Sequence, residues 1–335
     1  MEQAYILIEI IIKIVLATLI LMGFVAYTTL LERKALGWIQ VRIGPNRVGP
    51  WGLLQPIADG IKSFFKEDII PDQADKPLYV IAPGICLFTA LSMFAVVPFG
   101  GTIVMWGRQV KMVIADIDAG LLYVLALATL GEYGVVLGGW ASGSKYGVLG
   151  ALRAAAQMIS YEVALGLAVI GTIILAGSLR LTDIVAAQQG SWHSWFVWKY
   201  PFGFIFYIVA GLAEINRTPF DMPESESELA CGFNIEYSSM KFATFMIAEY
   251  AHMFVVASVA TTLFLGGSLG PGPIYLGPLW FLIKVFVIIF FFIWERGTFP
   301  RLRYDHIMHF GWKVLLPATL INVVGTSLLV ALGVL

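Results

Sequence analysis

Residues 214–241 read EINRTPFDMPESESELACGFNIEYSSMK, and they connect two apolar segments of membrane-spanning length. Six carboxylates in this stretch face only Arg217 and Lys241. Ionisable groups at the membrane are costly, and they indicate a functional site by default. The stretch therefore predicts a site that handles protons or a cationic partner, held at both ends by the bilayer.

The rest of the chain has the composition of a membrane protein. Its 335 residues are 59% hydrophobic and 13% charged, whereas soluble domains carry about 25% charged residues. Because apolar runs of about 20 residues mark membrane helices, we expect an all-α, polytopic integral membrane protein with a single membrane domain over residues 1–335. The expected transmembrane helices lie near residues 4–31, 78–98, 117–140, 156–176, 200–215, 240–266, 277–295 and 313–334.

A shorter amphipathic stretch follows the first apolar run. Residues 53–66, LLQPIADGIKSFFK, place apolar side chains on one helical face and polar side chains on the other. The run is too short to span the bilayer, so we expect an interfacial helix.

Basic residues fix the expected orientation. Residues 214–241 and the other connections on the same side of the membrane carry most of the lysines and arginines. The connections on the opposite side hold only Arg108, Lys111, Arg180 and Lys199. Basic loops face the cytoplasm. We therefore expect the acidic stretch on the inner side of the membrane, which is the cytoplasmic or matrix side, and both termini outside.

Several classes of function are excluded. The net charge is −1 and no basic stripe is present, which argues against nucleic acid. Cys86 and Cys231 form no CxxC pair, and only His252 lies inside an expected helix. We therefore expect no metal, iron–sulfur cluster, haem or other cofactor in this chain.

On this topology, four glutamates lie at a similar depth in the membrane. Glu132, Glu162, Glu214 and Glu249 come from four expected helices and lie in the inner half of the membrane, with Glu32 at the same level. Clustered carboxylates in a poorly solvated site can hold and pass protons near neutral pH. The pattern indicates a proton path that enters from the inside and stops near the midplane.

Each of these groups also has a structural interpretation. A single buried glutamate is often a hydrogen-bonded structural group, and we expect Arg217 to pair with Glu214. The outer half offers only Glu9 and Lys13, whose spacing predicts an intrahelical pair. Composition and spacing leave a transporter and a coupling subunit equally open.

Four motifs resemble one family. They are ERKALGWIQVRIGPNRVGPWGLLQPIADGIKSFFKED (32–68), GALRAAAQMISYE (150–162), EINRTPFDMPESESELACGFNIEYSSMKFATFMIAEY (214–250) and FPRLRYDHIMHFGWK (299–313). The chain resembles the membrane subunit of respiratory complex I, which is the H subunit of bacterial NADH:quinone oxidoreductase and subunit 1 of the mitochondrial enzyme.

The resemblance implies a place where the hydrophilic arm meets the membrane arm. Two hydrophilic-arm subunits, one with the terminal iron–sulfur cluster, would complete a quinone chamber, and FMN and the iron–sulfur clusters would lie in partner subunits. Quinone would be the substrate and would enter near the expected helices at residues 4–31 and 240–266 and near the interfacial helix. The membrane would be a bacterial inner membrane, with the mitochondrial inner membrane as the alternative. Small membrane-arm subunits, antiporter-like subunits and the lipid bilayer would be the other partners.

The resemblance also assigns residues to two roles. The positions that match the quinone chamber are Arg33, Asp59, Lys62, Phe242, Arg296 and Arg301. The positions that match the acidic coupling route are Glu132, Glu162, Glu214, Arg217, Glu224, Glu226, Glu228 and Glu249. In the family, this route links quinone reduction to proton translocation.

Other interpretations remain. The homologous membrane subunit of a hydrogenase, or of another complex with a different electron donor, carries similar motifs. A stand-alone proton-coupled transporter would need a polar path through the outer half, and a structural scaffold would leave the glutamates at matched depth unexplained.

Overall fold

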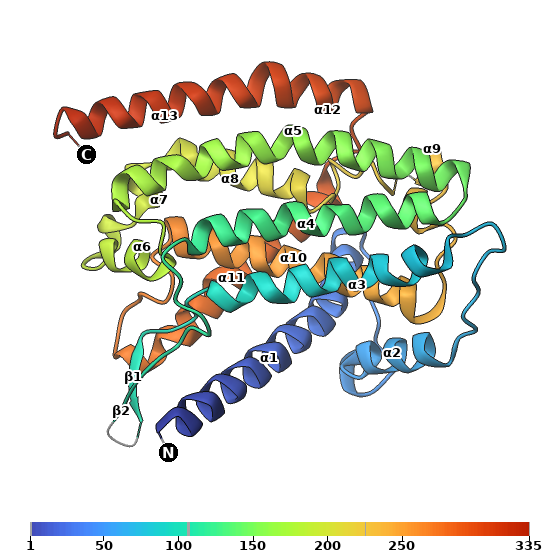
Figure 1. Cartoon of the computed structure of the whole chain (residues 1–335), viewed down its shortest axis with the longest axis horizontal. Helices are drawn as coiled ribbons and strands as arrows, with labels where there is room; N and C mark the ends of the chain where they lie inside the picture. Colours follow the sequence, from blue (N-terminus) through green and yellow to red (C-terminus); the bar gives the residue numbers. More distant parts are fainter. Residues whose placement is uncertain (1, 106–107, 225, 335) are drawn as a thin grey trace.

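The computed structural model describes residues 2–105, 108–224 and 226–334 of the chain. Within these residues the fold is a bundle of helices with a single two-stranded hairpin, as Figure 1 shows. The prediction of an all-α polytopic membrane protein is confirmed. Both termini lie at the end of the bundle that carries the hairpin, which we call the hairpin end (Figure 1). The opposite end carries α2 (Gln55–Phe65) and the acidic connection of residues 215–238, which we call the acidic segment, and this end is called the loop end.

The described residues contain seven helices that are long and apolar enough to cross a membrane. The long helices and the shorter α8 are α1 (Glu2–Ile39), α3 (Lys76–Met93), α4 (Gly120–Ala141), α5 (Lys145–Ala176), α8 (Pro201–Glu214), α10 (Ser239–Phe264), α11 (Gly277–Thr298) and α13 (Leu316–Ala331). The last span also includes α12 (Tyr304–Phe310) and the π-helical turn Gly311–Leu315.

Short elements fill the connections. They are the 3₁₀ turn Pro50–Gly52, α2 (Gln55–Phe65), the 3₁₀ turn Phe94–Val96, β1 (Thr102–Met105), β2 (Arg108–Lys111), α6 (Leu181–Ala187), the 3₁₀ turn Trp192–Ser194, α7 (Phe196–Lys199), α9 (Glu226–Leu229), and the 3₁₀ turns Gly232–Asn234 and Ile274–Leu276. The hairpin is antiparallel and pairs Thr102 with Lys111.

Two helices run further than the apolar runs indicate. The expected first span stops at residue 31, but α1 continues to Ile39, and α5 begins at Lys145 rather than near residue 156. Charged side chains end an apolar run, yet they leave the backbone hydrogen bonds of a helix intact. These extensions carry Glu32 and Arg33 on α1, and Arg153 on α5.

Helix α8 is shorter than the bilayer core. Its 14 residues span about 21 Å at 1.5 Å per residue, against a core of about 30 Å. Pro201 begins it, as prolines often do in the first turn of a helix. It ends before Asn216, whose φ is 57°. The acidic segment therefore starts inside the bundle rather than at its surface.

Small residues bring the central helices close together. At Gly139 of α4, an added Cβ would lie 2.5 Å from the carbonyl oxygen of Gly147 on α5. Membrane helices associate through such close contacts rather than through hydrophobic burial. Helix α10 lies at the centre of the bundle, and almost all its residues from Met253 to Phe264 are buried.

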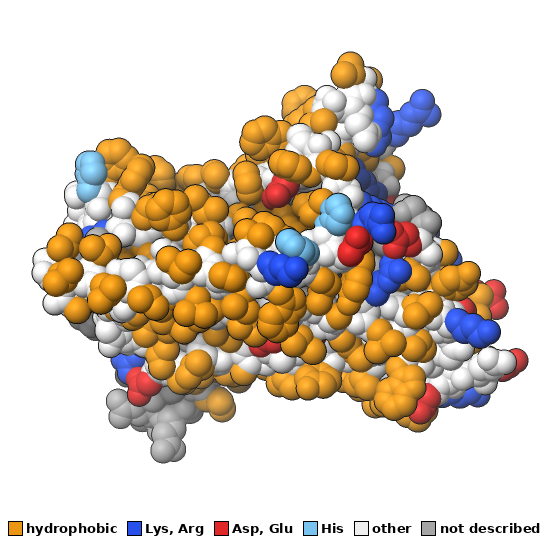
Figure 2. All heavy atoms as spheres, turned by 90° about the horizontal axis from the view of Figure 1, so that it is seen from above, with side chains coloured by type: hydrophobic (Ala, Val, Ile, Leu, Met, Phe, Trp, Pro, Cys, Tyr) orange, Lys and Arg blue, Asp and Glu red, His pale blue; other side chains and the backbone are white. Residues whose placement is uncertain are grey.

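The outer surface is apolar along the length of the bundle. Figure 2 shows one face covered mostly by hydrophobic side chains, with charged side chains gathered toward the loop end. Exposed large apolar residues are frequent on α1, α11 and α13. This surface is the one expected against lipid or against neighbouring membrane helices.

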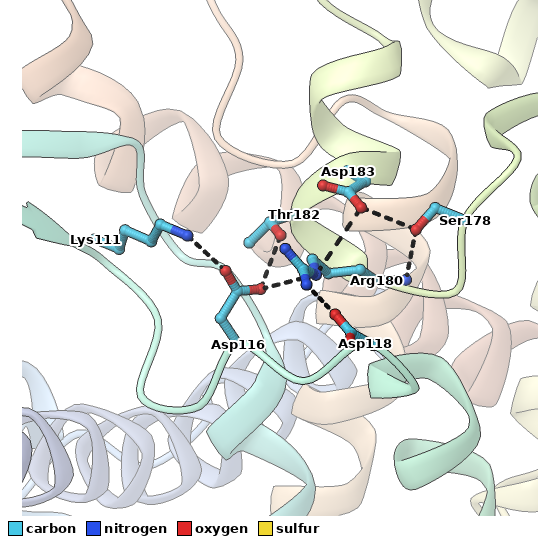
Figure 3. Close-up of polar contacts among 7 residues, drawn as sticks. All are labelled: Lys111, Asp116, Asp118, Ser178, Arg180, Thr182 and Asp183. Atoms are coloured by element: carbon cyan, nitrogen blue, oxygen red, sulfur yellow. Dashed lines mark hydrogen bonds and ion pairs between the residues drawn. The ribbon is translucent and has the colours of Figure 1, made fainter.

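The hairpin end is held together by polar contacts of two kinds. Buried Gln188 donates to the carbonyl oxygens of Ile184, Thr262 and Leu263, and it accepts from the backbone N–H groups of Phe196 and Gly266. Closer to the surface, Arg180 contacts Asp116, Asp118 and Asp183, as Figure 3 shows. These contacts join the segment that follows the hairpin to α6.

Candidate functional site

A cavity of about 610 Å³ lies among α3, α4, α10 and the acidic segment. Glu132 of α4, Glu214 of α8 and Glu249 of α10 line it, together with Glu224 and His252. The structure thus brings together three of the four helix glutamates from three different helices. A concave site with several ionisable groups is a functional-site candidate on physical grounds.

Glu162, the fourth helix glutamate, lies beside this cavity. Its carboxylate accepts a hydrogen bond from the Thr129 hydroxyl of α4, and it lies close enough to Glu132 and Glu214 for their charges to repel. Glu132 itself has one buried carboxylate oxygen with no hydrogen-bond partner among the described residues. Such unsatisfied groups are rare in folded proteins, and each calls for an explanation.

The expected pairing of Arg217 with Glu214 is wrong. Nη1 of Arg217 lies 2.8 Å and 2.9 Å from the two carboxylate oxygens of Glu32. Its Nε lies 2.6 Å from Oε1 of Glu249, and its guanidinium stacks over the Tyr250 ring at 4.4 Å. The left-handed turn at Asn216, just after α8, separates Arg217 from Glu214. Glu214 instead faces His252, with Oε1 and Nε2 3.8 Å apart.

Glu32 and Asp221 join the two sets of residues that the sequence assigns separately. Arg296 pairs with the buried carboxylate of Glu32, which also holds Arg217. Arg301 lies 3.0 Å from Asp221. Two arginines of the expected quinone chamber are therefore connected to the acidic cluster through a single carboxylate each.

The other expected chamber residues lie at the loop end on α1, α2 and α10. Arg33 lies 2.5 Å from Asp59, which also accepts a hydrogen bond from Gln55. Lys62 is exposed on α2, and Phe242 is 41% exposed in the first turn of α10. The amphipathic stretch 53–66 thus contains a helix, α2, that holds its polar side against α1.

The acidic segment itself divides into an inner and an outer part. Glu224 accepts a hydrogen bond from Asn234 at 2.8 Å and lines the cavity. Glu228 points away from the cavity and lies 2.6 Å from Arg153 of α5. The side chain of Glu226 lies outside those that the structure describes. Among the glutamates of this segment whose side chains the structure describes, Glu224 is the one that lines the cavity.

Two acids of this segment have shifted pKa values. Burial raises the pKa of Asp221 to about 6, and Arg301 offsets only part of that effect. Burial also raises the pKa of Glu224 to about 8, and the neighbouring charges of Glu249 and Asp221 add to it. A carboxyl with a pKa near 8 carries a proton at neutral pH, which it can give up when its surroundings change.

Close backbone packing and one buried amide hold the segment in place. A Cβ at Gly150 of α5 would lie 2.8 Å from the backbone nitrogen of Phe233, so this helix touches the segment directly. The side-chain amide of Gln157, also on α5, donates to the carbonyl oxygens of Ala213 and Phe220 and to Asn216. The segment is thus fixed on both sides of Arg217.

Some of these residues escape sequence reasoning. Glu32 lies at the depth that the topology indicates, but its role as the centre of an ion-pair network depends on Arg217 and Arg296, which are far away in sequence. His252 lies three residues after Glu249, a spacing that places both on one face of a helix. This spacing is the feature of the sequence that indicates that Glu249 and His252 can line one cavity.

Comparison with known proteins matches the sequence of this chain to one family. The family model described as NADH dehydrogenase matches residues 12–327. The chain belongs to the NADH dehydrogenase family. Relatives that share about half of its residues resemble it along nearly its whole length.

These relatives carry one name. The H subunit 2 of the NADH-quinone oxidoreductase of Geobacter metallireducens is 51% identical over 336 residues, which cover 97% of the chain and 96% of the relative. The H subunit of the Syntrophotalea carbinolica enzyme is 52% identical and covers 96% of each chain. The H subunit of the Protochlamydia amoebophila enzyme is 48% identical, over 90% of this chain and 91% of its own length.

Proposed function

We propose that the chain helps to form the quinone site of a proton-pumping NADH:quinone oxidoreductase and couples quinone reduction to proton translocation. One observation supports this most strongly: the Glu32 carboxylate holds both Arg296, on the chamber side, and Arg217, which holds Glu249 in the acidic cavity. A change of charge at Arg296 is thus linked to Glu249 of the cavity through three successive ion pairs.

The proposed chemistry needs protons from this chain and electrons from its partners. Reduction of quinone to quinol takes up two electrons and two protons. The electrons would come from an iron–sulfur cluster in a hydrophilic-arm subunit, which receives them from NADH through FMN in another subunit. Arg33, Arg296 and Arg301 would offset negative charge that develops on the quinone, and Asp59, Lys62 and Phe242 would line its approach.

Coupling would follow from electrostatics. Negative charge at the quinone competes for Arg296 and Arg301, and so it loosens their hold on Glu32 and Asp221. The pKa values of Asp221 and Glu224 lie near neutrality, so a modest change in local charge moves protons on or off these groups. Glu132, Glu162, Glu214 and Glu249 would pass that change into the membrane. The link between charge at the quinone and protonation of the cavity glutamates is a coupling free energy between two sites.

The loop end would face the cytoplasm of a bacterium. Most lysines and arginines lie in the connections of that end, as the positive-inside rule requires for the cytoplasmic side of an inner membrane. Both termini would then lie outside. The hydrophilic arm would cover the loop end, and the antiporter-like and smaller membrane subunits would pack against the apolar flanks of the bundle.

The proposal is tested by Glu214→Gln in the whole complex, with Glu9→Gln as a matched control. Glu9 is a membrane-helix glutamate at the hairpin end that pairs with Lys13 at 2.7 Å, as the sequence predicts. We expect assembly and particle mass to be unchanged in both variants. NADH:quinone reductase turnover should fall by at least about tenfold in Glu214→Gln, as for loss of a proton-transfer group, and should not fall in Glu9→Gln.

The alternatives give other outcomes. Wild-type turnover in Glu214→Gln would contradict the coupling role. A large purified particle that lacks NADH oxidation would indicate a complex with a different electron donor. A chain that purifies alone from mild detergent, under conditions that preserve other membrane complexes, would favour a transporter.

A further inference from the structure

The carboxylates that the membrane helices bring to the acidic cavity fall into two groups that differ in their basic partners. Glu249 is held by Arg217, and through it is linked to Glu32 and Arg296. Glu132, Glu162 and Glu214 form the second group, from α4, α5 and α8. Among the described side chains, only His252 lies within ion-pair distance of any member of this second group. The imidazole therefore stands where the two groups meet.

His252 is placed to contact both groups. It lies one helical turn after Glu249 on α10, and both residues line the cavity of about 610 Å³. Its Nε2 lies 3.8 Å from Oε1 of Glu214, which exceeds hydrogen-bond distance. A water occupies about 30 Å³, so the cavity has room for one to bridge this gap, or for a small rotation of the ring to close it.

Beyond His252 the surroundings become apolar. A second cavity, of about 320 Å³, extends toward the hairpin end between α4, α5, α8 and α10. It shares only Met93, Glu214 and His252 with the first cavity, and the rest of its lining is apolar except for Tyr207. The Tyr207 hydroxyl donates to the carbonyl oxygen of Val256 at 3.2 Å. A proton on His252 therefore has several carboxylate acceptors on the loop side, whereas Glu214 is the only carboxylate among the described side chains that line the second cavity.

We propose that His252 carries protons between Glu249 and the group of Glu214, Glu132 and Glu162, as the junction of the acidic route. Neutral imidazole accepts a proton at one ring nitrogen and donates from the other. A Glu249 carboxyl gives its proton to Nδ1, the Nε2–H bond breaks, and that proton passes to the Glu214 carboxylate. No electrons are transferred. This role rests on the proposed function of the acidic cavity.

The experiment compares His252→Asn and His252→Phe with His193→Asn in the whole complex. Asparagine keeps polarity but cannot titrate, and phenylalanine keeps the ring. His193 is an exposed histidine at the hairpin end, with its ring 4.3 Å from that of Trp192. Complexes are reconstituted into liposomes, and NADH:quinone turnover, quinone KM, and protons pumped per electron are measured between pH 6 and pH 8.

We expect both His252 variants to lower turnover by about tenfold or more with unchanged quinone KM, as for loss of a proton-transfer group. The pH profile should also change, because removal of His252 leaves Cys86, Glu132, Glu214, Glu224, Glu249 and Tyr207 as the ionisable side chains that line the two cavities. His193→Asn should match the wild type. If the phenylalanine variant fails to assemble, the asparagine variant decides.

Failure of this inference can be separated from failure of the proposed function. Wild-type turnover, pH profile and proton yield in His252→Asn overturn the junction role. If Glu214→Gln is impaired in the same preparation, the acidic route stands without His252. If Glu214→Gln is also unaffected, the proposed function falls with it.

Discussion

The two ends of the bundle hold their charges in opposite ways. At the hairpin end, Arg180 is surrounded by Asp116, Asp118 and Asp183, and Asp118 is 86% exposed (Figure 3). At the loop end, Arg217 is buried with Glu32 and pairs with the partly buried Glu249, and further carboxylates line the cavity beside it. Each aspartate at the hairpin end has a basic partner close to the surface, whereas the acids that line the cavity at the loop end outnumber the buried basic groups beside them.

The pKa values express the same difference. Burial alone would raise the pKa of Asp116, but the Lys111 ammonium and the Thr182 hydroxyl, with the charge of Arg180, hold it below its ordinary value. Burial dominates for Glu224, whose pKa rises to about 8. A cluster in which each acid has a basic partner keeps a fixed protonation state and serves structure. A cluster whose acids lack such partners and have pKa values near neutrality can exchange protons. The proposed function therefore depends on the loop end.

The largest effect is expected from Arg217→Gln. This substitution leaves the buried carboxylate of Glu32 and the partly buried carboxylate of Glu249 without their shared partner, which costs about 3–5 kcal/mol for a broken buried pair. We expect the complex to assemble poorly and to melt at a lower temperature, as measured by particle yield and thermal unfolding in detergent.

Arg217→Lys serves as the control for this prediction. Lysine keeps the charge but cannot hold two carboxylates in the fixed geometry of a guanidinium, so its loss of stability should be intermediate. Equal stability of the wild type and the glutamine variant would mean that the loop end tolerates unmatched charge far better than the comparison implies.

A pH-dependent effect is expected from Glu224→Gln. Because the folded pKa of Glu224 lies above its usual value of 4.5, the folded state keeps a proton that the unfolded state has lost. Its contribution to stability is therefore greatest below about pH 4.5, and it declines as the pH rises toward about 8. The variant should show a shallower fall in melting temperature between pH 5 and pH 8.5.

Glu228→Gln is the matched control on the same segment. Glu228 lies at the surface and pairs with Arg153, so its variant should keep the decline of the wild type. A Glu224→Gln complex with the full wild-type decline would show that other groups of the loop end carry the pH dependence.

Sequence reasoning reaches the helices and the depth of the acids, but not their partners. Apolar runs indicate the spans because lipid imposes one requirement on every spanning segment. The short spacing between Glu9 and Lys13 predicts their pair correctly, since one helical turn sets that geometry. Arg217 shows the limit: Glu214 is its neighbour in sequence, yet its partner Glu32 is 185 residues away.

The backbone bends that determine such contacts are only weakly indicated by the sequence. The left-handed conformation of Asn216 turns Arg217 away from Glu214, and many asparagines in loops do not adopt it. The outward direction of Glu228 depends on Arg153 of α5. Family resemblance supplies the roles of such residues, while the contacts that join the arginines of the chamber to the cavity become visible only in three dimensions.

The smallest effect is expected from Arg180→Gln at the hairpin end. Its side chain is 34% exposed, its partners Asp118 and Asp183 lie in solvent, and Asp116 keeps Lys111 as a partner when Arg180 is removed. Such pairs contribute less than about 1 kcal/mol each and are screened by salt. The melting temperature should change little and turnover not at all, in contrast to Arg217→Gln. A loss of stability or turnover comparable to that of the Arg217 variant would mean that the hairpin end is not a passive closure of the bundle, and that its charges take part in coupling.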